Sequence, residues 1–319
     1  MKFELTIQHE DDLYIPAVPE GVVWATDRKG SPGKLTFTVI KDDILKVTEG
    51  DNVRLTVNDT NLFYGFVFTR KRDKQNHIEI TAFDQMRYLC NKETYVYRDM
   101  TASDVIKMIA SDFKLETGTI DETEYKIPQR IEDNSSLFDI IYNALDHELK
   151  NKKKMYVLYD DFRKLSLKSL DSMKVDVLID EETGENFDYS SSIDDNTYNK
   201  INTYRDNDKT KKRDYFFAHH RDNIKKWGIL QHVDKLEEGE DGQAKADALL
   251  KLYNVKTRRL KISKALGDVR VRGGSMVGVK LDLGDVKVNN YMLVERCEHT
   301  FNESEHWMDL TMRGGDIHG

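Results

Sequence analysis

The sequence predicts an α+β protein that is mainly β, with two similar antiparallel β-barrel domains, a small α/β module between them and an inserted segment. Three observations predict this fold class. A β-pattern over residues 50–83 returns over residues 274–312, the apolar period becomes helical between about 96 and 170, and a polar segment interrupts the second β-region. The corresponding domains are residues 1–95, 96–170 and 171–319, with the insertion and a helix at about 205–254.

The repeated pattern is the strongest of these observations. Apolar residues alternate with polar ones along Gly50–Val57 and His77–Phe83, as in strands with one face on a core. A glycine start, an alternating strand, a turn and a second alternating strand return in Gly274–Leu281 and His306–Met312. We therefore expect one antiparallel β-unit used twice, and the chance similarity of two meanders is the alternative. Two similar barrels side by side suggest a ring with repeated wall segments.

The first domain reads as six or more short strands with turns between them, which favours a small barrel or sandwich. The expected strands are residues 3–7, 22–24, 35–39 and those of the 50–83 meander. The turn at 27–33 is rich in glycine and proline, which supply the backbone angles of a tight reversal. Residues 84–89 read as a short helix that leaves the domain.

The α/β module carries two helical patterns. Thr101 and Asp104 form a capping-box pattern, and the helix that follows is expected to stop near Gly118. Asn134 and Ser135 are expected to cap a second helix, whose apolar residues recur at helical spacing over 137–145. A hairpin over 155–168 completes the module.

The last part of the chain returns to strands. They are expected at 175–179 and 198–204 and in the second β-unit, whose turns fall at Gly284-Asp285 and 302–305. Residues 205–242 are polar and charged, and we interpret them as an exposed insertion. A helix is expected at 244–253, and 314–319 as a loose tail.

Composition excludes several function classes. The 319 residues carry a formal net charge of −8, which argues against a general grip on nucleic acid. No apolar run approaches the roughly 20 residues that cross a bilayer, and Met1–Leu5 already reads as a strand rather than a signal peptide. Cys90 and Cys297 are expected to be reduced and buried in a protein made in the cytosol.

Common catalytic and nucleotide-binding motifs are missing from the sequence. His219-His220 with Asp222, and His299 with His306 and Glu295, are candidate metal sites by spacing, but strand and hairpin polar residues explain both, so we assign no metal and no cofactor. Paired acids at Asp160-Asp161, Asp194-Asp195 and Glu181-Glu182 read as turn residues rather than as catalytic pairs.

Basic and aromatic residues alternate over 209–227, a pattern that could stack single-stranded nucleic acid. The acidic run 236–241 that follows favours a salt-bridged exposed face instead, so no specific nucleic-acid binding is expected.

A series of short segments, in order and spacing, resembles the baseplate hub proteins of contractile phage tails, in the group typified by the PBSX-like defective prophage particle. The segments are Trp24–Asp27, Gly33–Phe37, Gly50–Val53, Leu62–Arg70, Ile80–Asp84, Asn91–Tyr95, Thr101–Ile106, Asn134–Ile141, Trp227–Gln231, Leu266–Asp268 and His299–Thr311. The resemblance covers nearly the whole chain and is weakest over 205–241.

The resemblance implies two β-barrel tube domains and a homotrimer whose six barrels face the sixfold tail tube while the ring meets the threefold spike. It implies a structural protein that is not an enzyme and has no cofactor. Implied partners are a tail tube or tube-initiator protein, the spike, a wedge or LysM-type inner baseplate protein and the tape-measure protein, with no membrane insertion. Such a protein is made in the bacterial cytoplasm and built into the particle.

Seven polar positions alternate with the expected core positions, and we expect them to line the lumen of the ring or its protomer interfaces. They are Arg54, Thr56, Glu79, Thr81, Lys280, Asp309 and Thr311. The alternative functions are a tail-associated peptidoglycan hydrolase and a receptor- or carbohydrate-binding tail module.

Overall fold

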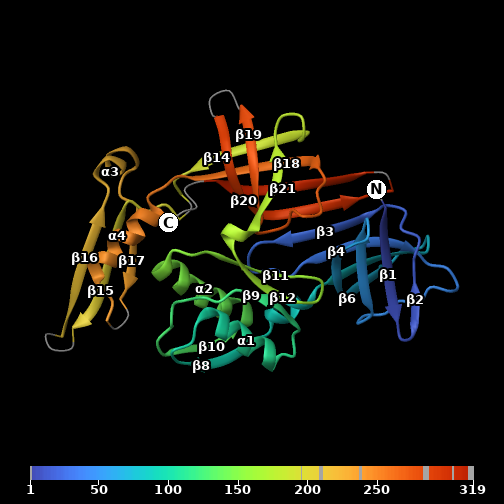
Figure 1. The fold of residues 1–319 in the computed structure, drawn as a ribbon, viewed down its shortest axis with the longest axis horizontal. Coiled ribbons are helices and arrows are strands. Elements are labelled where there is room, and N and C mark those ends of the chain that lie inside the picture. Colours follow the sequence, from blue (N-terminus) through green and yellow to red (C-terminus); the bar gives the residue numbers. More distant parts are fainter. Residues whose placement is uncertain are drawn as a thin grey trace. The chain divides into compact units, whose positions relative to one another are not determined.

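The computed structural model describes residues 2–194, 196–207, 211–236, 239–282, 287–303 and 305–314. Over these residues the protein is mainly β, as predicted (Figure 1). The chain forms two compact units: unit 1 combines Met1–Asp188 with Lys261–Met312, and unit 2 is built on Tyr189–Leu260. The turn at Gly284-Asp285, Asp195, part of the 209–227 pattern and the predicted tail lie largely or wholly outside the described residues.

Unit 1 is organised around a large sheet with the strand order β14-β18-β21-β20-β3-β4-β7-β6-β5-β1-β2, in which β13 and β19 form a branch beside β20. The strands are β1 (Phe3–His9), β2 (Asp12–Tyr14), β3 (Val22–Asp27), β4 (Lys34–Ile40), β5 (Asn52–Val57), β6 (Thr60–Arg72), β7 (His77–Phe83), β13 (Lys174–Ile179), β14 (Asn186–Ser192), β18 (Thr257–Leu266), β19 (Met276–Asp282), β20 (Lys287–Phe301) and β21 (His306–Gly314). β14 and β18 carry the chain out of unit 1 and back.

The repeated β-unit predicted from sequence is confirmed as a repeated meander. β5, β6 and β7 are consecutive antiparallel neighbours, and β19, β20 and β21 follow one another in the same way. The two meanders belong to one sheet, because β20 pairs with β19 along one half and with β3 along the other. The pairings between described residues do not close a ring of strands, so the two closed barrels stay a prediction.

The core of the first meander follows the predicted alternation. Val53, Leu55 and Val57 of β5 are buried, as are Ile78 and Ile80 of β7. They pack with buried residues of β1, β3 and β4 and with Phe301 at the end of β20. Residues from both ends of the chain therefore share one apolar core.

The α/β module has its own core, which joins its two α-helices to the strands beside them. Its elements are η1 (Gln85–Cys90), β8 (Lys92–Tyr97), α1 (Ala102–Asp112), β9 (Thr117–Ile120), β10 (Arg130–Ser136), α2 (Leu137–Lys152), β11 (Tyr156–Asp160), β12 (Leu165–Ser169) and η2 (Leu170–Met173). The capping box of Thr101 and Asp104 is present. The predicted cap of α2 is wrong: Asn134 and Ser135 lie in β10, and the Ser136 hydroxyl accepts the Asp139 N–H instead. Gly118 lies in β9 rather than at a helix end.

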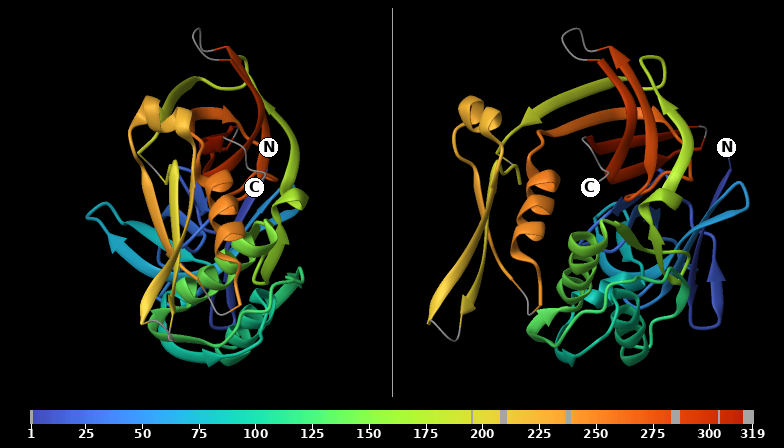
Figure 2. Two further views of the ribbon diagram at one scale, coloured as in Figure 1. Left: turned by 90° about the vertical axis from the view of Figure 1, so that its left-hand side faces the viewer. Right: turned by 60° about the vertical axis from the view of Figure 1, so that its left-hand side comes forward.

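Unit 2 is a small sheet of order β16-β15-β17, with β15 (Lys200–Asn207), β16 (Lys212–His219), α3 (Arg221–Trp227), β17 (Gln231–Lys235) and α4 (Gly242–Tyr253). The predicted helix at 244–253 is α4. Its Ala246 and Leu249 form an apolar core with Ile201 and Ala218 of the sheet. The segment interpreted as a polar insertion thus holds β16, α3 and β17 and contributes Ala218 to this core, and Figure 2 shows these elements in gold beside α4 in orange.

Candidate assembly site

One face of the large sheet carries a continuous row of short side chains, which we call the threonine row. Thr69 of β6 lies opposite Thr81 of β7, and Thr81 lies opposite Thr36 of β4. The row continues through Val23 of β3 to Thr300 of β20. Directly opposed residues of antiparallel strands point to the same face. The row therefore crosses from the first meander to the second on one side of the sheet.

The seven predicted positions all alternate with buried residues. Arg54 and Thr56 lie in β5, Glu79 and Thr81 in β7, Lys280 in β19, and Asp309 and Thr311 in β21, and each is exposed or half-buried. Whether they line a lumen or an interface stays a prediction.

The structure does not bring all seven to one surface. Thr81 belongs to the threonine row, but Lys280 lies opposite Asn289 of β20. Asn289 and Thr300 differ by an odd number of residues along one strand, so their side chains point to opposite faces. The side of β20 that is buried changes along the strand. Near one end it includes the even-numbered Met292, and near the other it carries the odd-numbered Cys297, His299 and Phe301. Leu293 and Val294 are also buried between them.

Three of the seven positions are held by local contacts. Glu79 forms an ion pair with Lys71 at 3.0 Å. The Arg54 guanidinium lies 5.2 Å from the centre of the Tyr64 ring, and the Asp309 carboxylate accepts the Lys264 N–H at 2.8 Å. Pairs on an exposed face such as Lys71–Glu79 contribute about 1 kcal/mol or less to stability.

A buried charge cluster joins three segments that are distant in sequence. Asp84 accepts the Gly33 N–H at 2.9 Å and the Met86 N–H at 3.0 Å. Asp160 accepts from the Gln85 side chain at 2.8 Å, and Arg272 donates to the Asp160 carbonyl at 2.9 Å. The cluster thus fastens the α/β module to the first meander and to the loop before β19.

Burial governs the charges in this cluster. It raises the pKa of Asp84 well above its usual range, an effect that neighbouring Asp160 increases. Burial likewise raises the pKa of Asp160 and lowers that of Arg272. The Arg272 guanidinium lies 4.3 Å from the Tyr159 ring centre, and its Nε has no hydrogen-bond partner among the described residues. Asp160, which sequence analysis interprets as a turn residue, is instead a buried end of β11.

Two glycines after Arg272 allow this loop to approach the sheet. The Gly273 N–H donates to the Thr26 hydroxyl at 2.8 Å, and a Cβ on Gly273 would lie 2.5 Å from the Asp27 carbonyl carbon. Gly274 has a φ of +96°, and a Cβ there would lie 2.3 Å from a Val157 methyl group. Neither position accepts a side chain without movement of its neighbours.

The two histidines considered for a metal site are in contact but are arranged as a hydrogen-bonded chain. His299 Nε2 lies 2.8 Å from the Val271 carbonyl, which fixes its proton there, and its Nδ1 lies 2.9 Å from His306 Nε2. Glu295 pairs with Arg28 instead. Burial lowers the pKa of His299 to about 3 and that of His306 to about 4. Both rings are therefore neutral at pH 7.

The remaining candidates give no metal or thiol site. His219 ends β16, while the His220 ring accepts the Asn223 N–H as the cap of α3. The described residues contain no group of three or more potential metal ligands.

Cys297 is buried as expected, but the expected burial of Cys90 is wrong, because Cys90 lies exposed at the end of η1. No helix among the described residues is long and apolar enough to cross a membrane.

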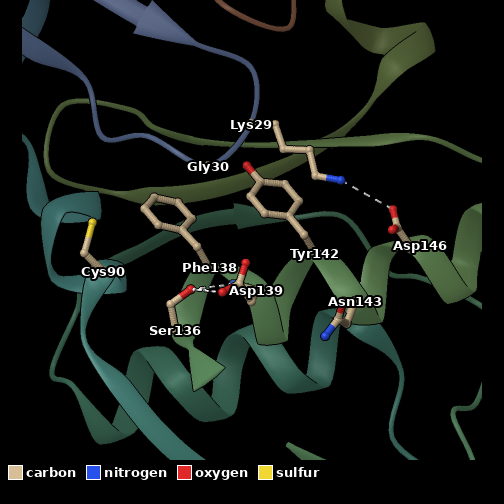
Figure 3. Close-up of a pocket in the computed structure, with 9 residues that line it drawn as sticks. All are labelled: Lys29, Gly30, Cys90, Ser136, Phe138, Asp139, Tyr142, Asn143 and Asp146. Atoms are coloured by element: carbon tan, nitrogen blue, oxygen red, sulfur yellow. Dashed lines mark hydrogen bonds and ion pairs between the residues drawn. The ribbon is translucent and has the colours of Figure 1, made fainter. Parts of the chain in front are cut away.

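Cys90 borders a shallow cavity of about 310 Å³ between α2 and the β3–β4 loop (Figure 3). Its polar groups already contact one another. The Lys29 ammonium lies 3.7 Å from Asp146 and 5.0 Å from the centre of the Tyr142 ring, and Ser136 donates to Asp139 at 2.6 Å. These contacts cap α2 and join it to the β3–β4 loop, and they account for the polar groups that line the cavity.

Comparison with known proteins places the chain among phage-related proteins. It is 30% identical to the uncharacterised protein YqbQ of Bacillus subtilis over 93% of this chain and 92% of that one. It is 28% identical to the phage-like element PBSX protein XkdQ of the same organism, over 94% of each chain. The predicted resemblance to the PBSX-type group is thereby confirmed.

Solved structures share the fold at low identity. The 43 kDa tail protein of prophage MuSo2 from Shewanella oneidensis is 11% identical, with a TM-score of 0.69 over 99% of this chain and 100% of that one. The Escherichia coli protein c3393 is 9% identical, with a TM-score of 0.59 over 99% of this chain and 78% of that one. It is described as a type VI secretion component similar to the T4 tail proteins gp27 and gp5. A model of the YqbQ-like family matches residues 22–313, and the chain belongs to that family.

Proposed function

We propose that this protein is a structural component of a phage-like tail, the baseplate hub that joins the tail tube to the central spike. The observation that carries the proposal is the single sheet in which β20 connects two similar meanders. One chain then supplies two comparable wall segments, and three chains supply six. The tail-protein relatives and the shared fold support the same role.

In this proposal three copies form a closed ring through head-to-tail contacts, and the seven polar positions line its lumen or its protomer boundaries. The ring seeds tube assembly on one side and meets the spike on the other. The net charge of −8 favours passage of a polyanion rather than its capture. Wedge, LysM-type and tape-measure proteins are further proposed partners.

The test is assembly of the purified chain, alone and with the tube and spike proteins of its own gene cluster. Light scattering over a range of concentrations gives the mass, and electron microscopy of the mixtures gives the symmetry. A threefold ring, alone or with those partners, supports the hub. A twofold dimer that joins neither partner contradicts it.

A second candidate, a receptor- or carbohydrate-binding module, is favoured by one observation in unit 2. Tyr215 and Phe217 of β16 are 50% and 53% exposed, and their rings stack 6.1 Å apart on the sheet face opposite α4. Flat aromatic rings with polar neighbours suit the apolar faces of sugars. Binding of labelled protein to host cells, compared with Tyr215→Ala/Phe217→Ala, separates this candidate from the hub, which does not need the two rings.

The peptidoglycan hydrolase has no comparable support. Asp84 and Asp160 are the buried carboxyl pair of the charge cluster, and their oxygens accept bonds from backbone N–H groups and Gln85. Turbidity clearing of cell-wall suspensions tests this alternative directly.

A further inference from the structure

A basic pocket lies at one end of the first meander in unit 1. It has a volume of about 550 Å³ and is lined by His9, Lys41, Leu45, Lys46, Val47, Thr48, Arg70, Arg72 and Ile78. Arg70 and Arg72 lie opposite Ile80 and Ile78 of β7, so they point to the side of the sheet that is apolar elsewhere. They therefore place two cations on the side of the sheet that elsewhere packs in the core, in a chain whose formal net charge is −8.

Only part of this positive charge is balanced within the chain. Arg70 is bound by Glu49 through two contacts of 3.1 and 3.0 Å, and His9 lies 3.0 Å from Asp51. Lys41, Lys46 and Arg72 have no carboxylate partner among the described residues: half-buried Lys41 donates to the Asp42 carbonyl, and Arg72 donates to the Asn76 side chain. Two exposed cations therefore remain above an apolar floor formed by Leu45, Val47 and Ile78, each at most 5% exposed.

Another part of unit 1 carries exposed acidic side chains next to exposed apolar ones. We call it the acidic turn, Asp180–Glu182, and it lies between β13 and β14. Glu181 and Glu182 are exposed, and the Asp180 carboxylate holds the turn by accepting the Glu182 and Thr183 N–H groups at 3.1 Å. Leu178 and Phe187 flank the turn and are 51% and 48% exposed. The acidic turn and the basic pocket adjoin opposite ends of the strand order of the large sheet. β14, beside the turn, is the first strand, and β1 and β2, beside the pocket, are the last.

We propose that the acidic turn of one copy docks into the basic pocket of the next copy. Glu181 and Glu182 would meet Lys46 and Arg72, while an apolar flanking side chain would cover the pocket floor. The contact joins two different surfaces, so it is of the head-to-tail kind that closes rings. Opposite charges at such a boundary fix the register and the partner. The inference rests on the proposed trimeric ring and names one of its contacts.

Charge reversal in the full chain tests the contact. The pocket variant is Lys46→Glu/Arg72→Glu, the turn variant is Glu181→Lys/Glu182→Lys, and a third chain carries all four changes. The control Lys74→Glu/Lys92→Glu makes the same change in net charge at two exposed lysines outside the pocket. Light scattering in 50 mM salt should show at least tenfold weaker association for either double variant, recovery with all four changes and no effect of the control.

A peptide assay decides the matter if the chain alone is monomeric. The probe is a fluorescein-labelled peptide of residues 178–187, and the comparison is a shuffled peptide of equal composition. Fluorescence anisotropy should show saturable binding to the wild type and to the control, and at least tenfold weaker binding to the pocket variant. Equal binding of the shuffled peptide, equal loss in the control or no binding to a monomeric wild type overturns the docking contact.

The outcomes separate this inference from the hub itself. A threefold ring that is indifferent to all charge reversals overturns the docking contact and leaves the hub standing. A chain that joins no ring with tube or spike, but binds its own peptide at the pocket, overturns the hub and keeps the docking surface. Thermal melts of every variant, expected to agree within a few degrees, show that the folded chain is being compared.

Discussion

His306 Nε2 lies 2.9 Å from His299 Nδ1, and the His299 Nε2–H donates to the Val271 carbonyl at 2.8 Å. The chain of hydrogen bonds needs a neutral His299, because Nδ1 acts as the acceptor. Protonation of this ring removes the acceptor and places a charge beside buried Phe301 and Cys297. The pair therefore connects the last hairpin to the loop before β19 only while it is uncharged.

The first prediction concerns acid stability. The folded-state pKa values of about 3 and about 4 lie below the usual 6.5. The unfolded chain therefore binds more protons, and the free energy of unfolding falls as the pH decreases below 6.5. Urea unfolding at pH 7 and 5 should show that His306→Gln, which keeps a donor to His299, reduces this loss by about 1 kcal/mol after allowance for its partial exposure. The exposed His219→Gln is the control. An equal loss of unfolding free energy between pH 7 and pH 5 in the wild type and in both variants contradicts the prediction.

The second prediction concerns the buried charge cluster. Arg272→Met removes the buried guanidinium that donates to the Asp160 carbonyl at 2.9 Å, and leaving this buried acceptor without its donor should cost about 1–3 kcal/mol. Arg270→Met, two residues away, removes an exposed guanidinium paired with Asp268 and should cost less than about 1 kcal/mol. Urea unfolding at pH 7 measures both. Equal losses would mean that Arg272 contributes no more than a surface arginine.

The third prediction separates backbone strain from packing. Gly50 and Gly274 have φ values of +95° and +96°, but a Cβ on Gly50 meets nothing within 4 Å. Gly50→Ala should destabilise the fold by about 1–2 kcal/mol through backbone conformation alone. Gly274→Ala adds the clash with Val157 and should cost about 1–3 kcal/mol more. Thermal unfolding of the two variants gives the difference, and equal melting temperatures refute the packing contribution.

The fourth prediction tests the threonine row. Thr81→Arg places a long cation in the middle of the row, on a half-buried face rather than in the core. We expect the unfolding free energy to change by about 1 kcal/mol or less, and the proposed hub function predicts that assembly with the tube protein weakens at least tenfold. Ser111→Arg, at the exposed end of α1, adds the same charge and should assemble normally. Normal assembly of Thr81→Arg would mean that the threonine row takes no part in the proposed assembly.

The sequence predicts the elements whose pattern is local. The alternation of Val53, Leu55 and Val57 identifies β5, and the capping box at Thr101 places the start of α1. The cap of α2 is displaced by one to two residues because Asn134, Ser135 and Ser136 are all good caps, and only the fold shows which of them leaves β10.

Long-range relationships are harder to predict from one sequence. Arg272 and Asp160 are 112 residues apart, and no pattern in either segment indicates their contact. One signal in the sequence does point to this loop. Two adjacent glycines follow Arg272, and they indicate a place where the backbone approaches its neighbours closely. The sequence does not predict unit 2 as a folded unit. Its apolar core is small and its strands carry charges on the open face, so the alternation of apolar and polar residues along them is weak.

The shared strand β20 also determines how the protein carries load. Its two halves are hydrogen-bonded to β19 and to β3, and these bonds run perpendicular to the strand. A pull along β20 therefore loads both ladders in shear, where many bonds must yield together rather than one after another. The two meanders cannot hinge separately about this strand, and a force applied to one is borne by the other.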